Sequence, residues 1–405
     1  MNTPRVCITT LEFPPDIGGV GESVHRIAQM LLALGYQVHV AVFRATFRAE
    51  REKASAGKFQ RPSRQTVEQD GIIVHRLQPA IRSTTAREQD YLHDLYSQLK
   101  SLHQQYQFDL FHAFFISETG FLTTLLGREI NIPVINSIRG ADLHKHIFNP
   151  KHHGQITWTL ENSAWTTFVS QNLMNRARVL APTIQAKSSA FWNSIAPIEF
   201  VRMPKPPSAE QLQGIVIGSV GNFRDKKGLE YLLDACRQLQ KELEFTLLLV
   251  GDFVQKEREY WEQELSNSGV MDRVLITGKI SRQEALAYLP HMDIFTIPSL
   301  HDGCPNAMLE AMLASRAIVG AKVDAIGEIL SDGEDALVVN PASSEELAEA
   351  LLKLARSPEL RQRLGQAANA KVLKHLAPAV EQANWGEVYE QALKPLKPSI
   401  MAIAS

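Results

Sequence analysis

The sequence predicts an α/β protein built from two doubly wound domains. Its 405 residues are too many for one ordinary hydrophobic core, and this length suits two. Apolar residues make up 44% of the chain and charged residues 21%, as in a normal globular protein. Strand-like and helix-like segments alternate in both halves, which is the pattern of parallel βαβ units. Tandem domains of this kind bind ligands in the cleft at the carboxyl ends of their strands.

The N-terminal half opens with a short β-rich run at residues 5–13, followed by a glycine loop. Residues 22–35 show helical spacing, because their apolar side chains share one face and Gly35 stops the pattern. Residues 37–43 form the next expected strand, which completes a first βαβ unit. Further units follow, with a helix at 89–106 and strands at 108–115 and 133–140.

A proline-rich segment at 204–213 is typical of a linker, and a second α/β series begins after it. Its expected strands cover residues 214–223, 245–253, 274–280, 293–299, 317–323 and 336–340. Its expected helices cover residues 228–240, 282–291, 344–357 and 358–373. We therefore expect an N-terminal domain over 1–205 and a C-terminal domain over 206–376.

Composition argues against several classes of protein. The formal net charge is −2, so the molecule as a whole is not built to bind nucleic acid. Its three cysteines stand far apart, which argues against a disulfide scaffold and fits a reducing compartment. We see no signal peptide and no run of about 18 apolar residues, so we expect a cytoplasmic protein that does not span a membrane. Residues 43–65 hold seven Arg or Lys and two Glu, which predicts a mobile basic loop.

Two segments have features that suit a bound phosphate. Gly18 and Gly19 follow the first strand, where glycine lets backbone N–H groups approach an anion; a plain βα turn is an equal alternative. Arg224, Lys226 and Lys227 gather between a strand and a helix in the second half. Cations at the carboxyl end of a strand suit a diphosphate, and a solvated basic turn is the alternative.

A third segment, residues 299–314, carries two acids. Asp302 lies on the loop between a strand and a helix, and Glu310 lies one to two turns into that helix, on its polar side. The loop offers backbone N–H groups at a helix N-terminus, again suited to phosphate. A carboxylate accepts hydrogen bonds from adjacent hydroxyls such as those of a ribose, so the two acids suit a ligand with hydroxyls at both ends. Two solvated carboxylates are the alternative.

In this order and on these elements, the three segments resemble the family 4 retaining glycosyltransferases, whose GT-B fold has two Rossmann-like domains facing a central cleft. The resemblance covers nearly the whole chain. It implies that Lys227 holds the donor phosphates, Glu310 the ribose and Asp302 the sugar. Further donor contacts are implied for Gly18, Gly19, Gly278, Lys279, Ile280, Gly303, Cys304, Pro305 and Asn306. The family's last helix commonly returns to the N-terminal domain, and residues from about 377 to 405 are placed to do so.

The chain departs from the family pattern at three positions. Asp302 stands where the family usually has a glutamate. Asn222 falls on the usual arginine of the basic pair, so Arg224 or Lys226 must supply the second charge. Arg139 falls where a histidine that contacts the donor sugar is common.

The resemblance implies transfer of a sugar, with retention, from a UDP- or GDP-sugar to a saccharide, lipid-linked or small-molecule acceptor. Lys227 and Arg224 would stabilise the departing diphosphate, and Asp302 and Arg139 complete the implied catalytic set. No acidic cluster stands beside the basic segment, so we expect fixed cations in place of a metal, and no cofactor.

Several alternatives stay open. His112 either lines the cleft on the acceptor side or is a buried, hydrogen-bonded histidine. Residues 43–65 either face a phosphorylated or membrane-borne acceptor, with peripheral contact at the inner membrane face, or form a solvated loop. Four histidines between residues 144 and 153 are a weak metal candidate. Other enzyme classes are a nucleotide-sugar epimerase, a sugar phosphorylase and a dinucleotide-dependent oxidoreductase, and the non-enzyme alternative is a nucleotide-sugar-binding partner subunit without catalysis.

Overall fold

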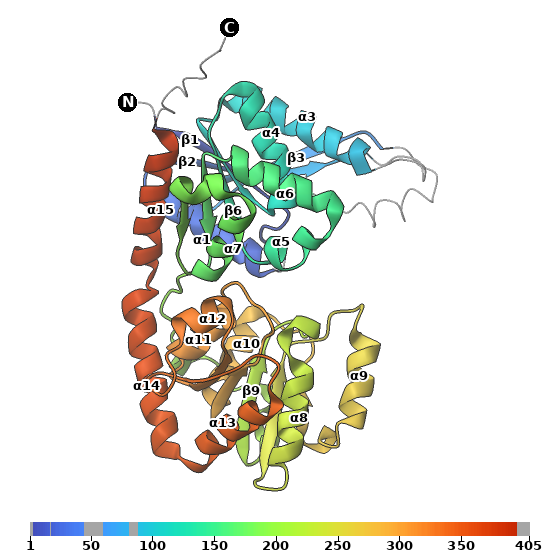
Figure 1. The fold of residues 1–405 in the computed structure, drawn as a ribbon, viewed down its shortest axis with the longest axis vertical. Coiled ribbons are helices and arrows are strands. Elements are labelled where there is room, and N and C mark those ends of the chain that lie inside the picture. The colour runs from blue at the N-terminus through green and yellow to red at the C-terminus, as the bar shows by residue number, and fades with distance from the viewer. Residues whose placement is uncertain (1–2, 17, 44–59, 81–87, 395–405) are drawn as a thin grey trace. The chain divides into compact units, whose positions relative to one another are not determined.

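Two separate β-sheets organise the chain (Figure 1). The computed structural model describes residues 3–16, 18–43, 60–80 and 88–394. The chain divides into two compact units. Unit 1 comprises Met1–Val169, Leu173–Phe191 and Gln382–Ser405, and unit 2 comprises Ser170–Asn172 and Trp192–Glu381.

Unit 1 is built on an eight-stranded sheet with the order β3-β4-β2-β1-β5-β6-β7-β8, in which only the β3–β4 pair is antiparallel. The strands are β1 (Arg5–Thr10), β2 (Gln37–Phe43), β3 (Ser63–Gln69), β4 (Ile72–Gln78), β5 (Leu110–Phe114), β6 (Val134–Ile138), β7 (Trp165–Phe168) and β8 (Ser188–Ala190). The helices that lie wholly or mostly in this unit are α1 (Gly19–Ala33), α3 (Glu88–Tyr106), α4 (Phe121–Ile130), α5 (Ala141–His144), α6 (Pro150–Asn162), α7 (Gln171–Leu180) and α15 (Pro378–Leu393).

Alternate residues of β1 enter two different hydrophobic cores of unit 1. Val6 and Ile8 pack with α1 and with Trp385 of α15, the last helix. Cys7 packs on the opposite face, with apolar residues of α3 and α4. Helices therefore cover both faces of the sheet, which is the doubly wound arrangement that the sequence predicts.

Unit 2 is built on a parallel six-stranded sheet with the order β11-β10-β9-β12-β13-β14. Its strands are β9 (Ile215–Val220), β10 (Phe245–Val250), β11 (Val274–Ile276), β12 (Ile294–Ile297), β13 (Ala317–Ala321) and β14 (Leu337–Val339). Its helices are α8 (Leu229–Leu239), α9 (Arg258–Asn267), α10 (Arg282–Tyr288), α11 (Asn306–Leu313), α12 (Asp324–Ile329), α13 (Ser344–Arg356) and α14 (Pro358–His375). The strand order reverses between β9 and β12, so the loops that follow these two strands flank the place where such a sheet binds ligands.

The two faces of this second sheet are also both covered. Leu247 and Leu249 of β10 pack with α8 and α13, whereas Leu248 and Val250 pack with α10 and α11. An all-parallel sheet needs cover on both faces, and this explains why its strands read as continuous apolar runs. The predicted α/β class, with two parallel-sheet domains, is confirmed.

Unit 2 begins before the expected linker. Four side chains before residue 205 pack against the unit 2 core formed with α10 and α11, namely Trp192, Ile198, Phe200 and Met203. The chain therefore enters this unit well before residue 205. Hydrophobic side chains spaced irregularly along an extended segment carry no periodic signal, and only the prolines that follow them suggested a boundary.

Two local boundaries in unit 1 also differ from those expected. Helix α1 begins at Gly19, so this glycine lies in the first turn of the helix rather than in the loop. Within the expected basic loop at 43–65, residues 44–59 lie outside the described residues, and Ser63 already belongs to β3. Strand β3 is almost entirely exposed, so no apolar alternation marked it in the sequence.

Candidate functional site

The loops that follow β9 and β12 meet at the carboxyl edge of the unit 2 sheet. A short 3₁₀ turn, Asp225–Lys227, ends at Gly228, whose φ is 64°. A Cβ atom on Gly228 would lie 2.1 Å from the carbonyl oxygen of Pro298, just after β12. Beyond it, the N–H of Leu300 donates to the carbonyl of Lys226 at 2.9 Å. Only a glycine therefore allows the basic turn to approach the end of β12 this closely.

This close approach yields a stability prediction. Gly228→Ala should lower the free energy of unfolding by about 1–3 kcal/mol, because alanine disfavours this φ and its Cβ meets backbone. Gly269→Ala is the matched control, since Gly269 has a φ of 73° but a Cβ there would meet nothing within 4 Å. Urea unfolding of both variants should show the larger loss for Gly228→Ala. Equal losses would mean that the contact with Pro298 is unimportant.

Asp302 joins the two loops through its carboxylate. Lys227 Nζ lies 2.6 Å from Asp302 Oδ2, and Lys226 Nζ lies 3.5 Å from Oδ1. The three side chains are between 14% and 24% exposed, so water screens these charges weakly. Burial alone raises the pKa of Asp302, but the charges of Lys227 and Lys226 outweigh it and lower that pKa to about 2. The structure thus brings the predicted phosphate lysine and the predicted sugar acid into direct contact.

Arg224, the other predicted phosphate cation, is exposed and has an extended backbone just before the basic turn. Asp225, the next residue, donates its N–H to Glu257 Oε2 at 2.8 Å, which anchors the turn to the start of α9. Burial lowers the pKa of Lys226, and the charge of Asp302 partly opposes this, while Lys227 and Arg224 lower it further. The three basic side chains therefore form one electrostatic cluster, which an added anion would stabilise.

Glu310 is buried on α11, at 6% exposure, and it has a partner that the sequence did not reveal. Arg282 Nε and Nη2 donate to Glu310 Oε1 at 2.9 and 2.7 Å. Arg282 is the first residue of α10, whose start is set by a capping box between Ser281 and Glu284. That S-x-x-E pattern is visible in the sequence, but nothing in it links Arg282 to an acid on another helix.

A second residue missed by sequence reasoning is Asp324, at the start of α12. Its Oδ2 accepts a hydrogen bond from the N–H of Asp302 at 3.0 Å. Asp324 is 7% exposed, so a second acid lies buried behind the loop that carries Asp302. No spacing rule connects two acids on different βα loops, and only the folded sheet brings them together.

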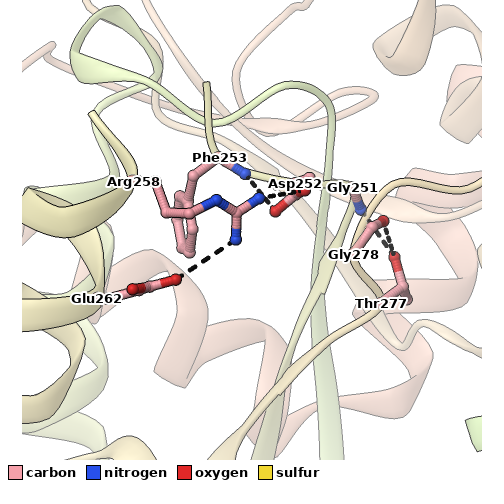
Figure 2. Close-up of polar contacts among 7 residues, drawn as sticks. All are labelled: Gly251, Asp252, Phe253, Arg258, Glu262, Thr277 and Gly278. Atoms are coloured by element: carbon pink, nitrogen blue, oxygen red, sulfur yellow. Dashed lines mark hydrogen bonds and ion pairs between the residues drawn. The ribbon is translucent and has the colours of Figure 1, made fainter. Parts of the chain in front are cut away.

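The segment implied to lie near the nucleobase is tied to the end of β10 (Figure 2). The N–H of Gly251 donates to Thr277 Oγ1 at 2.9 Å, and that hydroxyl donates to the carbonyl of Gly278 at 3.0 Å. The predicted strand at 274–280 consequently ends at Ile276. Beyond it, Lys279 is exposed and Ile280 is partly buried against the unit 2 core.

An ion-pair chain lies next to this segment. Figure 2 shows Arg258 between two acids, paired with Asp252 and, at 3.4 Å, with Glu262. Asp252 follows Gly251, whose φ is 130° and whose Cβ, if present, would lie 2.0 Å from the carbonyl oxygen of Gly221. The loops after β9 and β10 are therefore packed backbone to backbone, and the loop after β11 joins them through the Thr277 hydroxyl.

The remaining predicted donor contacts of unit 2 follow β12 directly. Gly303 accepts a hydrogen bond from the N–H of Ala325 at 3.3 Å, and Cys304 accepts one from Asn193 Nδ2 at 3.1 Å. Pro305 precedes α11, and Asn306 is its first residue. The loop is thus held through its carbonyl groups by a backbone N–H and a side-chain amide, and it leads into a helix N-terminus as predicted from the sequence.

In unit 1, the glycine loop has an acid beside it. A Cβ atom on Gly18 would lie 2.0 Å from Glu12 Oε2, whereas one on Gly19 would meet nothing within 4 Å. The start of the loop is held by Arg76 of β4, which donates to Asp16 Oδ2 at 2.9 Å and to the carbonyl oxygen of Phe13 at 3.3 Å. The atoms nearest to Gly18 belong to the flexible end of the Glu12 side chain, so this contact by itself does not require a glycine at position 18.

His112 is the buried, hydrogen-bonded alternative of the sequence analysis. It has no exposed surface, and its Nδ1 and Nε2 lie 2.8 Å from Tyr389 Oη and 2.7 Å from Ser137 Oγ. Burial, with a smaller effect of the Arg139 charge, lowers its pKa to about 3, so the ring is neutral at pH 7. Arg139 itself lies 6.0 Å from the centre of the Phe114 ring. The structure therefore gives His112 partners inside unit 1 rather than a surface position for an acceptor.

Comparison with known proteins gives matches in both units. The model for the glycosyl transferase 4-like domain matches residues 18–201, and the model for glycosyl transferases group 1 matches residues 214–357. An uncharacterized glycosyltransferase of Methanocaldococcus jannaschii is 23% identical over 304 residues, which are 74% of this chain and 79% of that protein.

Solved structures agree in fold. Sucrose-phosphate synthase from Thermosynechococcus elongatus superposes with a TM-score of 0.78 at 19% identity, over 96% of this chain and 99% of that one. Anabaena HepE in complex with UDP-glucose gives a TM-score of 0.73 at 16% identity, over 95% and 99% of the two chains. With both of its units matched, this chain is an enzyme that belongs to the group 1 glycosyl transferases and has their GT-B fold.

Proposed function

We propose that this glycosyltransferase uses a nucleotide diphosphate sugar, a UDP- or GDP-sugar, and retains the configuration of the anomeric carbon. The observation that carries the proposal is the cluster of Lys226, Lys227 and Asp302 at the carboxyl ends of β9 and β12. The strand order reverses there, and ligands of such sheets bind at that place. HepE, which shares the fold, was solved with UDP-glucose, and this supports the same class of donor.

In this proposal, the cations of the cluster act on the leaving group. Negative charge grows on the diphosphate as the glycosidic bond breaks, and Lys227 and Arg224 would stabilise it. Asp302 would accept a hydrogen bond from a sugar hydroxyl, and Glu310, oriented by Arg282, would accept from the ribose. Because the pKa of Asp302 is about 2, this acid stays a pure acceptor throughout the neutral range.

The family resemblance adds residues of unit 1 to the proposal. Gly18, Gly19 and Arg139 are assigned to the donor side by that resemblance alone. The acceptor is a saccharide, a lipid-linked sugar or a small molecule. Residues 43–65, most of which lie outside the described residues, would face it or contact a membrane surface. Among the described residues, no helix has both the length and the apolar character needed to cross a membrane.

A donor screen tests the proposal. UDP-, GDP- and ADP-sugars should be compared by thermal shift, because a donor that binds the folded protein raises its melting temperature. Transfer with the best donor should then give a product whose anomeric configuration, read by NMR, matches that of the donor. An inverted product would contradict retention. Donor binding without turnover, across a panel of saccharide, lipid-linked and small-molecule acceptors, would favour the non-catalytic partner subunit.

We further propose that transfer needs no metal ion. Among the described residues, no group of three or more His, Cys, Asp or Glu is arranged to hold one. Fixed cations at 226 and 227 supply the positive charge that a divalent ion supplies in other transferases. Turnover should therefore persist in excess EDTA. Activity that EDTA abolishes and Mg²⁺ or Mn²⁺ restores would contradict this expectation.

A further inference from the structure

Asp324 combines two unfavourable features beside the candidate site. Its φ is 40°, in the left-handed region that L-residues seldom adopt. Only 7% of the residue is exposed, so its carboxyl group is largely removed from water. A strained backbone and a buried acid persist only where surrounding contacts require them.

The contacts made at the start of α12 converge on the main chain after β12. Asp324 Oδ2 accepts from the N–H of Asp302 at 3.0 Å, and the N–H of Ala325 donates to the carbonyl of Gly303 at 3.3 Å. On its other side, the same loop is bound to the basic turn, because Leu300 donates its N–H to the carbonyl of Lys226. The loop is thus held between α12 and the basic turn.

The main chain is what decides where the Asp302 carboxylate lies. An aspartate side chain has only two rotatable bonds, so its carboxylate follows the position of its backbone closely. Here that carboxylate reaches Lys227 at 2.6 Å and Lys226 at 3.5 Å. A shift of the Asp302 backbone would therefore change the distances from its carboxylate to both lysines.

We infer that Asp324 is a positioning residue of the donor site, which holds the Asp302 carboxylate against Lys226 and Lys227 by accepting the Asp302 N–H. The inference rests on the proposed function, in which this cluster binds the donor sugar and diphosphate. Asp324 contacts this cluster by accepting the N–H of Asp302, so the role assigned to it is to position Asp302.

Two substitutions separate the effect of the acceptor oxygen of Asp324 from the effect of its backbone conformation. Asparagine tolerates a positive φ and keeps an amide oxygen, so D324N should retain kcat/KM within about threefold. Glycine adopts this φ freely and removes the acceptor, so D324G should lower kcat on the order of 10–10²-fold with UDP-glucose or the best donor of the screen. If D324G does not fold, D324S, whose hydroxyl is too short to reach, takes its place.

Hydrogen exchange provides a measurement that does not depend on activity. A peptide spanning residues 299–306 should exchange faster in D324G than in D324N and the wild type, whereas peptides of β10 should be unchanged. The position of a glutamate carboxylate depends less on the backbone, because its side chain is longer. D324G should therefore lower kcat by a smaller factor in a D302E background than in the wild type.

The outcomes are distinct. Wild-type kcat together with wild-type exchange in D324G would overturn the inference. Faster exchange with unchanged kcat would limit Asp324 to a structural role and would overturn it too. If the wild-type protein turns over no donor, the proposed function fails, while exchange at 299–306 still decides whether Asp324 holds the Asp302 loop.

Discussion

Lys227→Ala is expected to lower kcat on the order of 10²-fold or more, while donor affinity falls by less. The Lys227 side chain is 19% exposed, and its Nζ lies 2.6 Å from Asp302 Oδ2, at the place assigned to the diphosphate. The charge on that group grows as the bond to the sugar breaks, so the lost contact is worth more in the transition state than in the ground state. A 10²-fold loss corresponds to about 2.7 kcal/mol of the barrier.

Steady-state kinetics at saturating donor, together with calorimetric donor binding, separates the two effects. Lys241→Ala serves as the matched control, because Lys241 is exposed in the stretch between α8 and β10. Circular dichroism should first show that both variants fold. Near-normal kcat in folded Lys227→Ala would exclude Lys227 as the phosphate lysine and turn attention to Arg224 and Lys226.

The same substitution changes the titration of Asp302. In the wild-type protein, the two lysines lower the pKa of this buried acid to about 2 against the effect of burial. Removing Lys227 takes away the lysine that lowers this pKa more, so the pKa of Asp302 should rise in the variant. Because the wild-type pKa lies below the ordinary value of 3.8, ionised Asp302 stabilises the fold at neutral pH, and this contribution is lost as the pH falls toward 2.

Glu310→Ala should instead weaken donor binding and leave kcat nearly unchanged. Glu310 is assigned to the ribose, which changes little during the reaction, so its contacts are equal in ground and transition states. A hydrogen bond to a charged group is worth about 1.5–3 kcal/mol, which corresponds to a rise in donor Kd on the order of 10–10²-fold. Calorimetry with the donor and steady-state KM measure this rise.

Arg282→Ala distinguishes this role from a structural one. Arg282 donates twice to Glu310 Oε1 but is itself half-exposed, so its loss should change donor affinity less than the loss of Glu310 does. Glu349→Ala, an exposed substitution on α13, controls for the effect of alanine on a helix. If Glu310→Ala and Arg282→Ala lowered stability equally and neither changed donor Kd, Glu310 would be only the partner of Arg282.

The order of motifs along the chain was predictable because each depends on local signals. Strand-like and helix-like apolar patterns that alternate along the chain, together with turn residues, indicated the parallel units. The glycine loop, the basic turn and the two acids followed their strands as expected. Strand β3 was not predicted, because an exposed edge strand has no alternation of apolar and polar residues. The early start of unit 2 could not be predicted, because Trp192 and the apolar residues after it are spaced irregularly along the sequence.

By itself, the sequence determined the two-domain α/β class and the family, and it placed Lys227, Asp302 and Glu310 after their strands. Only the tertiary structure decided which of these residues meet. Asp302, on the loop after β12, contacts Lys227 after β9 and Asp324 at the start of α12, and Glu310 of α11 contacts Arg282 of α10. The physical reason is that periodicity reports which face of an element is buried, whereas partners across a parallel sheet follow from strand order and backbone packing, which no local pattern encodes.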